Sequence, residues 1–86
     1  MTGPGEPEIM VRVSSADELL WEGPAQSVSS ENQSGPFDIL PGHANFITMI
    51  EGKPIIIRSA GGDKSFKYRT AVVYVSDGII KIFTGV

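Results

Sequence analysis

Few residues in this 86-residue chain could carry out chemistry. His43 is its single histidine and it has no cysteine, so metal sites built on a histidine pair or on thiolates are excluded. Serines and acids are plentiful, but no Gly-x-Ser-x-Gly pattern positions a nucleophile beside that one possible base. A lone histidine after Pro-Gly is more often a turn or interface residue, and we interpret His43 in this way.

The other polar patterns also favour a structural explanation. Gly61-Gly62-Asp63-Lys64 lacks the GxxxxGK(S/T) spacing that cradles phosphates, so we expect a hairpin tip there. The side chains of Asp17 and Glu18 diverge in an extended segment, which disfavours shared acid–base work. Trp21 is either a partner anchor or a core residue, and the core is favoured. These residues predict a binding module rather than an enzyme, with no catalytic residue, cofactor or metal.

Composition limits the partners. The net charge is −3, from ten acidic and seven basic residues, and no basic run would attract nucleic acid. Uninterrupted apolar stretches, such as residues 54–57, are far too short to span a membrane. Residues 1–7 lack the basic and apolar regions of a signal peptide and are rich in Gly and Pro. We therefore expect no nucleic-acid partner and no membrane insertion.

The apolar pattern predicts strands throughout. Short β-branched runs are bounded by turn residues, and no segment sustains helical spacing. Ile9, Val11 and Val13 alternate with polar neighbours, as on one face of a strand. Asp77-Gly78 is the strongest hairpin signal, because both central residues of a type I′ turn need positive φ. Gly61-Gly62-Asp63 predicts a second hairpin.

Further strands are expected over residues 19–21, 25–30, 37–40, 46–50, 55–57, 65–75 and 79–83, with a polar loop from Glu31 to Gly35. We expect residues 55–57 to be buried on both faces, and Ile56, Val73 and Ile80 or Ile82 to lie in the core. The fold class is therefore all-β: a small flattened antiparallel β-sandwich of about eight to ten short strands. Residues 1–7 are expected to form a flexible tail, and residues 8–86 one domain that is monomeric when isolated.

Residues 35–44, Gly-Pro-Phe-Asp-Ile-Leu-Pro-Gly-His-Ala, resemble the hallmark segment of the epsilon subunit of F-type ATP synthases, called delta in mitochondria. That segment runs Gly-Glu-Phe/Leu-Gly-Ile-Leu-Pro-Gly-His-Ala. Shorter similar stretches follow the family in order over residues 8–83: they are residues 15–17, 20–23, 54–58, 66–68 and 73–75. The Leu-Pro-Gly-His-Ala core is the most specific part of the resemblance.

The resemblance implies a flattened β-sandwich at the foot of the central stalk of the rotor. Ser15, His43 and Thr48 fall where the family faces the gamma subunit. Gly35 and Pro36 fall in the loop that meets the ring of membrane c subunits. It further implies a peripheral, non-catalytic subunit without a cofactor of its own. For a bacterial-type enzyme it would lie on the cytoplasmic side of the energy-transducing membrane.

The chain departs from the family pattern at several positions. The acidic residue of the c-ring loop is Pro36 here, and we expect Glu31 to serve as the acid of that loop. Asp38 replaces the glycine after the phenylalanine, and Asn45 replaces the proline after the alanine. Arg69-Thr70-Ala71 replaces a Ser-Gly-Gly bend before the last hairpin.

The family's C-terminal helical hairpin binds ATP in some bacteria and inhibits hydrolysis. No such hairpin is expected in the domain formed by residues 8–86, so we expect no ATP-reversed inhibition from it. The functional hypothesis is a non-catalytic rotor subunit that links gamma to the c-ring and couples proton or sodium flow to ATP synthesis. The alternative is a free-standing β-sandwich module that binds another protein, for example through an edge strand.

Overall fold

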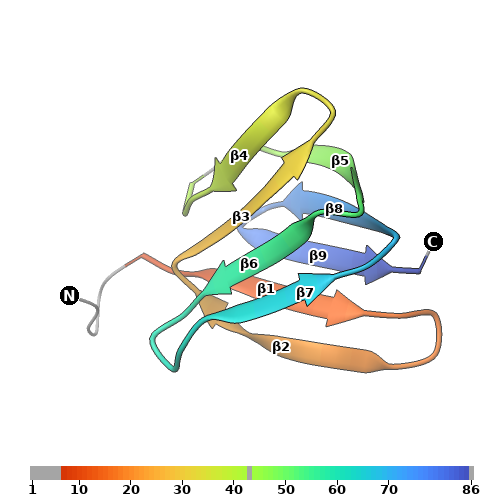
Figure 1. The fold of residues 1–86 in the computed structure, drawn as a ribbon. Coiled ribbons are helices and arrows are strands. Elements are labelled where there is room, and N and C mark those ends of the chain that lie inside the picture. Colours follow the sequence, from red (N-terminus) through yellow and green to blue (C-terminus); the bar gives the residue numbers. More distant parts are fainter. Residues whose placement is uncertain (1–6, 43, 86) are drawn as a thin grey trace.

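The structure, a computed structural model, describes residues 7–42 and 44–85, and these form two β-sheets packed face to face (Figure 1). In spatial order, sheet A contains β2 (Leu19–Ala25), β1 (Ile9–Ser14), β9 (Ile79–Thr84), β8 (Thr70–Ser76) and β5 (Phe46–Glu51). Sheet B contains β4 (Gly35–Ile39), β3 (Ser27–Asn32), β6 (Pro54–Arg58) and β7 (Lys64–Lys67). The predicted all-β sandwich is confirmed. The described residues form no helix that could cross a membrane.

One strand pair departs from the antiparallel pattern. β1 and β9 run parallel, with Val11 opposite Ile80 and Val13 opposite Ile82. The first strand of the chain therefore lies inside sheet A, between β2 and the last strand. Alternation of apolar residues could not reveal this pairing, because it is the same for parallel and antiparallel neighbours when one face is buried.

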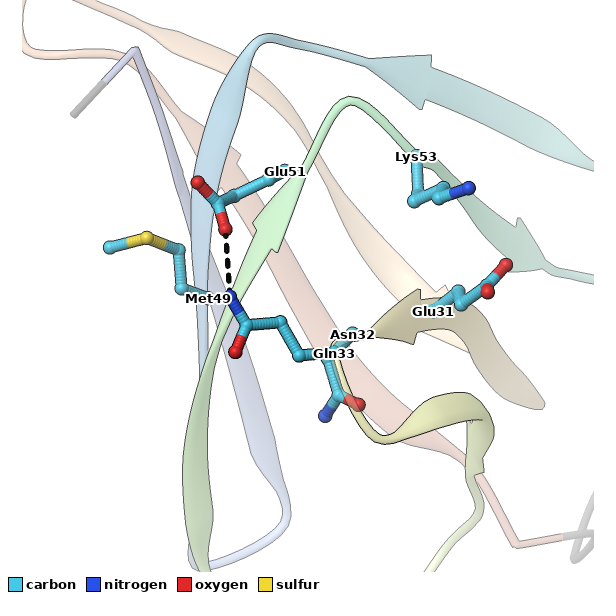
Figure 2. A pocket seen from close by; sticks show the side chains of 6 residues that line it. All are labelled: Glu31, Asn32, Gln33, Met49, Glu51 and Lys53. Atoms are coloured by element: carbon cyan, nitrogen blue, oxygen red, sulfur yellow. Dashed lines mark hydrogen bonds between the residues drawn. The ribbon is translucent and has the colours of Figure 1, made fainter.

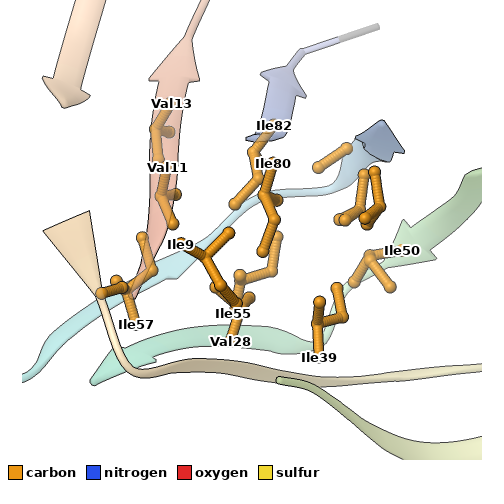
Figure 3. Close-up of a cluster of buried hydrophobic side chains, with 14 residues drawn as sticks. Ile9, Val11, Val13, Val28, Ile39, Ile50, Ile55, Ile57, Ile80 and Ile82 are labelled. Carbon is orange, nitrogen blue, oxygen red and sulfur yellow. The ribbon is translucent and has the colours of Figure 1, made fainter. Parts of the chain in front are cut away.

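The core lies between the sheets and is built from alternate residues of the strands (Figure 3). Its buried members are Ile9, Val11, Val13, Ala25, Val28, Ile39, Ile50, Ile55, Ile57, Ala71, Val73, Val75, Ile80 and Ile82. The predictions for Val73, Ile80 and Ile82 are confirmed. The prediction for Ile56 is wrong: it is half-buried and points away from the core. A two-sheet sandwich has one interior, so each strand can bury only one face.

The Asp77-Gly78 turn is confirmed. Asp77 has φ 53° and Gly78 has φ 78°, the two positive values that a type I′ turn requires. In this hairpin Ser76 pairs with Ile79, so only two residues connect β8 to β9. The tight turn fixes the register that places Val75 opposite Ile80 and Val73 opposite Ile82 inside the core.

Several predicted boundaries are wrong, and the strand expected over residues 19–21, for example, extends to Ala25. The loop expected from Glu31 to Gly35 is only a two-residue turn at 33–34, because Glu31 pairs with Pro36 and Asn32 with Gly35. The long strand expected over residues 65–75 is split into β7 and β8, which belong to different sheets. The chain crosses between the sheets at Tyr68 and Arg69, whose carbonyls both accept the N–H of Gly52 (3.2 and 3.0 Å).

The turns gather at two ends of the sandwich. The turns at 15–18, 33–34 and 52–53 share one end, called here the acidic end. At this end Thr84 Oγ1 donates to the Ser14 carbonyl (3.3 Å), and Gly85 N–H donates to the Thr70 carbonyl (3.1 Å). The β8–β9 turn lies at the opposite end, where Asp77 N–H donates to Asn45 Oδ1 (3.1 Å).

Candidate protein-binding surface

The outer face of sheet A is apolar. Alternation turns every second side chain of its strands away from the core and toward solvent. Seven of the eight exposed large hydrophobic residues among those described lie on this face, and Leu40 is the exception. The seven are Met10, Leu19, Ile47, Met49, Tyr74, Ile79 and Phe83. A contiguous exposed patch of this kind is typical of a protein-binding surface.

Strand register arranges most of the outer face of sheet A in three rows that cross the strands, and Glu51 and Thr70 are opposite each other beyond them. One outer row is Pro24, Met10, Ile79 and Ser76. The other outer row is Leu19, Ser14, Phe83, Val72 and Met49. The middle row is Glu22, Arg12, Lys81, Tyr74 and Ile47. Within these three rows, charge is confined to the middle row, and the flanking rows are apolar except for Ser14 and Ser76.

The charged half of the middle row contains one ion pair. Arg12 Nε donates to Glu22 Oε2 (2.8 Å), and Arg12 Nη2 lies 2.7 Å from the same oxygen in an ion pair. Both side chains are well exposed, so the pair contributes at most about 1 kcal/mol to stability. Beside it an open depression of about 470 Å³ is lined by Arg12, Ser14, Leu19, Lys81 and Phe83. The depression thus joins two cations to two large apolar side chains.

The outer face of sheet B is polar by comparison. Ser29 Oγ donates to Asp38 Oδ1 and accepts from Arg58 Nη1 (2.6 Å), which links β4, β3 and β6. These side chains already have partners within the domain. Trp21 does not add to either outer face, because it pairs with Val13 on the inner side of β2 and packs against the core. Sheet A therefore presents the larger apolar surface.

Ser15, predicted to face gamma, has a local contact instead. Its Oγ accepts the N–H groups of Asp17 (3.3 Å) and Glu18 (3.2 Å), which shapes the turn between β1 and β2. The hydroxyl therefore acts first on its own turn, as serine commonly does.

Thr48, the second residue predicted to face gamma, points inward. Its Oγ1 accepts from Asn32 Nδ2 (3.0 Å) and so joins β5 to β3 across the two sheets. β9 and β8 separate β1 from β5, a distance of about 14 Å at ordinary strand spacing. The structure therefore does not bring Ser15 and Thr48 together. His43, the third residue, lies outside the described residues.

The residues predicted to face the c-ring lie at the acidic end. Glu31 and Pro36 are opposite each other on the outer face of sheet B, and Gly35 begins β4 with φ 117°. A pocket of about 160 Å³ opens beside them between the β3–β4 turn and the end of β5 (Figure 2). Its lining consists of Glu31, Asn32, Gln33, Met49, Glu51 and Lys53.

This pocket is polar and carries both signs of charge. Gln33 reaches across it, and its Nε2 donates to Glu51 Oε1 (3.5 Å; Figure 2). Among the described residues, no group of three or more His, Cys, Asp or Glu is placed to hold a metal ion. The acidic end can offer carboxylates, amides and one lysine to a polar partner, which is hydrogen-bonding and ion-pairing chemistry.

Sequence reasoning missed the residues of the outer face of sheet A. A signal was present: in residues 79–83, Ile-Ile-Lys-Ile-Phe, apolar side chains occupy both faces of the strand. Residues 46–50, Phe-Ile-Thr-Met-Ile, show the same excess. In a sandwich with one interior, such strands must expose apolar side chains.

Comparison with known families decides the classification. The model of a family described as the ATP synthase delta/epsilon chain, beta-sandwich domain, matches residues 8–85. The chain belongs to this family. The beta-sandwich domain of the family agrees with the two-sheet architecture of this chain.

Solved structures share the fold of this delta/epsilon chain. A chain in the cryo-EM structure of the Euglena gracilis mitochondrial ATP synthase (OSCP/F1/c-ring, rotational state 1) superposes with a TM-score of 0.80 at 19% identity. A chain in the Tetrahymena thermophila mitochondrial ATP synthase central stalk/c-ring structure gives 0.75 at 12% identity. The matches cover 98% and 87% of this chain, but 56% and 61% of those chains. The chain thus spans less than two thirds of either relative.

Proposed function

We propose that this delta/epsilon chain is a non-catalytic subunit of the central stalk of an F-type ATP synthase. It links the gamma subunit to the c-ring, so that rotation driven by proton or sodium flow reaches the sites of ATP synthesis. The observation that carries the proposal is the exposed apolar outer face of sheet A on a domain of this family. Such a face is stabilised when a partner covers it.

The outer face of sheet A is the gamma-binding surface. It spans all five strands and carries seven exposed large hydrophobic side chains, whereas the outer face of sheet B is polar and internally paired. Ser15 lies at one margin of this face, in the turn after β1, and Thr48 on its edge strand β5. Ser15 contributes by shaping the turn between β1 and β2, and Thr48 by joining β5 to β3, rather than through free hydroxyls.

The acidic end meets the c-ring. Glu31, Gly35 and Pro36 lie at the end of the β3–β4 hairpin, and Glu31 and Glu51 line one pocket there with Lys53. Gly52, in the turn after β5, donates its N–H to the carbonyls of Tyr68 and Arg69, where the chain crosses between the sheets, and this ties the acidic end to both sheets. A close-packed two-sheet core deforms little under shear, so a force on the acidic end is transmitted to the gamma-binding face.

We propose residues 8–86 as one domain of this subunit. The subunit is peripheral to the energy-transducing membrane, on the cytoplasmic side in a bacterium, and is a monomer before assembly. Catalysis occurs on partner subunits, and this chain needs no cofactor of its own.

The test is binding to the gamma subunit of the same organism, measured by co-purification and by isothermal titration calorimetry. The unaltered chain is expected to form a one-to-one complex. Replacing Phe83 and Met49 by Asp should weaken binding at least about tenfold, because charge is placed in the apolar row. Leu40→Asp is the matched control: Leu40 is as exposed but lies off the face.

The outcomes separate the alternatives. Absence of gamma binding by the folded, unaltered chain would contradict the rotor assignment and favour a free-standing interaction module. Loss of binding in Leu40→Asp, with no loss in the Phe83 and Met49 variant, would place the gamma contact on the β4–β5 connection, the segment that includes His43.

A further inference from the structure

One lysine stands at the centre of the outer face of sheet A. β9 is the third of five strands, and Lys81 is its residue in the middle row. Apolar side chains flank it on its own strand, because Ile79 precedes it and Phe83 follows it on the same face. Side chains at the centre of an interface are the ones most completely removed from water when a partner binds.

Lys81 brings a charge that this face does not balance. Its neighbours in the row are Arg12 on one side and Tyr74 on the other. Glu22 is already paired with Arg12, and Glu51 lies on the edge strand β5, two strands away from β9. Within the described residues the Lys81 side chain makes neither a hydrogen bond nor an ion pair, although it is half-buried.

This arrangement restricts what can cover the face. An ammonium group that is removed from water without a partner costs several kcal/mol in free energy, which would offset much of the gain from the apolar rows. A purely apolar partner is therefore disfavoured at this position. A partner that places a carboxylate opposite Lys81 pairs the charge and keeps the apolar contact on both sides.

We propose that Lys81 is a specificity-determining residue of this face, and that the face recognises an apolar protein surface carrying one acidic side chain at its centre. The depression lined by Arg12, Leu19, Lys81 and Phe83 receives that side chain. Its carboxylate meets the ammonium of Lys81, and its methylene groups lie against Leu19 and Phe83. Arg12 adds to the positive potential, although Glu22 partly neutralises it.

Other anionic partners fit less well. One unpaired lysine on a chain of net charge −3 attracts an anionic lipid surface weakly, at about 1 kcal/mol per cation. Nucleic acid needs several phosphate contacts for measurable affinity at physiological salt. A single carboxylate within an apolar surface requires only one unpaired cation, and Lys81 provides it.

The experiment rests on the proposed function for the choice of probe, which is the gamma subunit of the same organism. Calorimetric titrations compare the unaltered chain with Lys81→Met, Lys81→Glu and Lys81→Arg. Lys81→Met, although more apolar, should bind about 10- to 100-fold more weakly, Lys81→Glu more weakly still, and Lys81→Arg within a few-fold of the unaltered chain. Lys67→Met, an exposed lysine of sheet B, is the matched control and should bind unchanged.

A second measurement identifies the acidic partner. Aspartates and glutamates on the surface of gamma are replaced one at a time by lysine, and one of these variants should restore binding to Lys81→Glu. Thermal unfolding of each Lys81 variant within a few degrees of the unaltered chain shows that the fold is intact.

The outcomes distinguish the two proposals. If Phe83→Asp weakens binding while Lys81→Met binds gamma equally well or more tightly, the role of Lys81 is overturned and the gamma-binding face stands. If the unaltered chain does not bind gamma, both proposals fail. Lys81-dependent sedimentation with anionic lipid vesicles, without a Lys81 effect on gamma binding, would assign the lysine to a membrane surface and overturn the acidic-protein proposal.

Discussion

Three consecutive isoleucines of β6 illustrate how side-chain direction decides a residue's role. Ile55 and Ile57 are 1% and 0% exposed and lie in the core, whereas Ile56 points to the outer face of sheet B. The sequence Ile-Ile-Ile alone does not distinguish them, because a strand buried on both faces reads in the same way. Their packing distinguishes them, because only Ile55 and Ile57 lose a full set of core contacts on truncation.

Alanine substitutions in β6 should therefore differ sharply. Ile55→Ala and Ile57→Ala are each expected to lower the free energy of unfolding by about 2–5 kcal/mol, through lost burial and a residual cavity. Ile56→Ala is the matched control and should cost less than about 1.5 kcal/mol. Urea unfolding monitored by circular dichroism measures all three. Equal losses at the three positions would contradict the one-interior arrangement.

Thr48 offers a second contrast at this scale. Its Oγ1 accepts the side-chain amide of Asn32 at a partly buried position, so Thr48→Val leaves that N–H without its acceptor at nearly unchanged volume. The expected loss of unfolding free energy is about 1–2 kcal/mol, and Thr48→Ser should recover most of it. A Thr48→Val variant with unchanged stability but weakened gamma binding would show that the hydroxyl contacts the partner directly.

At the scale of elements, the β8–β9 hairpin was the most predictable part of the fold. Asp-Gly is one of the few dipeptides that readily adopts two successive positive φ values, and the structure shows both. The register that follows places the central row of the outer face, because Tyr74 then lies opposite Lys81. The Asp77-Gly78 turn thus determines the position of Lys81 at the centre of the outer face of sheet A.

Substitution of the turn glycine tests this dependence. Gly78→Ala should cost about 1–2 kcal/mol, because a Cβ is disfavoured at φ 78°. Gly61→Ala in the β6–β7 hairpin is the control: Gly61 has no positive φ and an added Cβ would meet nothing within 4 Å. That variant should stay within about 1 kcal/mol of the unaltered chain. Differential scanning calorimetry measures the stability of both variants. Equal destabilisation would argue against a φ-specific cause.

Other elements could not be predicted from local pattern. The run over residues 65–75 reads as one strand, but it crosses between sheets at Tyr68 and Arg69, where bonds from Gly52 replace strand pairing. The outer face of sheet A likewise depends on strand order, which alternation does not encode. The resemblance at residues 35–44 indicated the family and hence the architecture. The rows of side chains across sheet A could be identified only from the strand register in the structure.

At the scale of the whole molecule, the two strands that lie farthest apart in sequence are neighbours in sheet A. β1 pairs with β9 in parallel, although nearly the whole chain separates them in sequence, and β2 occupies the other side of β1. Without β1, sheet A would be divided into β2 alone and the β9–β8–β5 group. Val11 and Val13 would also leave the core, where both are 0% exposed. The N-terminal strand is therefore required for the outer face of sheet A to exist as one surface.

A chain that lacks residues 1–14 is accordingly expected not to fold: it should lose cooperative urea unfolding and its β-sheet circular dichroism. A chain that lacks only residues 1–7 is the control and should unfold at the same urea midpoint as the unaltered chain, because β1 begins at Ile9. A synthetic peptide of residues 7–16, added in excess to the longer deletion, should restore cooperative unfolding, since it can pair with β2 and β9 and return Val11 and Val13 to the core. Cooperative unfolding of the longer deletion without the peptide, at the unaltered midpoint, would mean that β1 is dispensable and that sheet A does not depend on its interior strand.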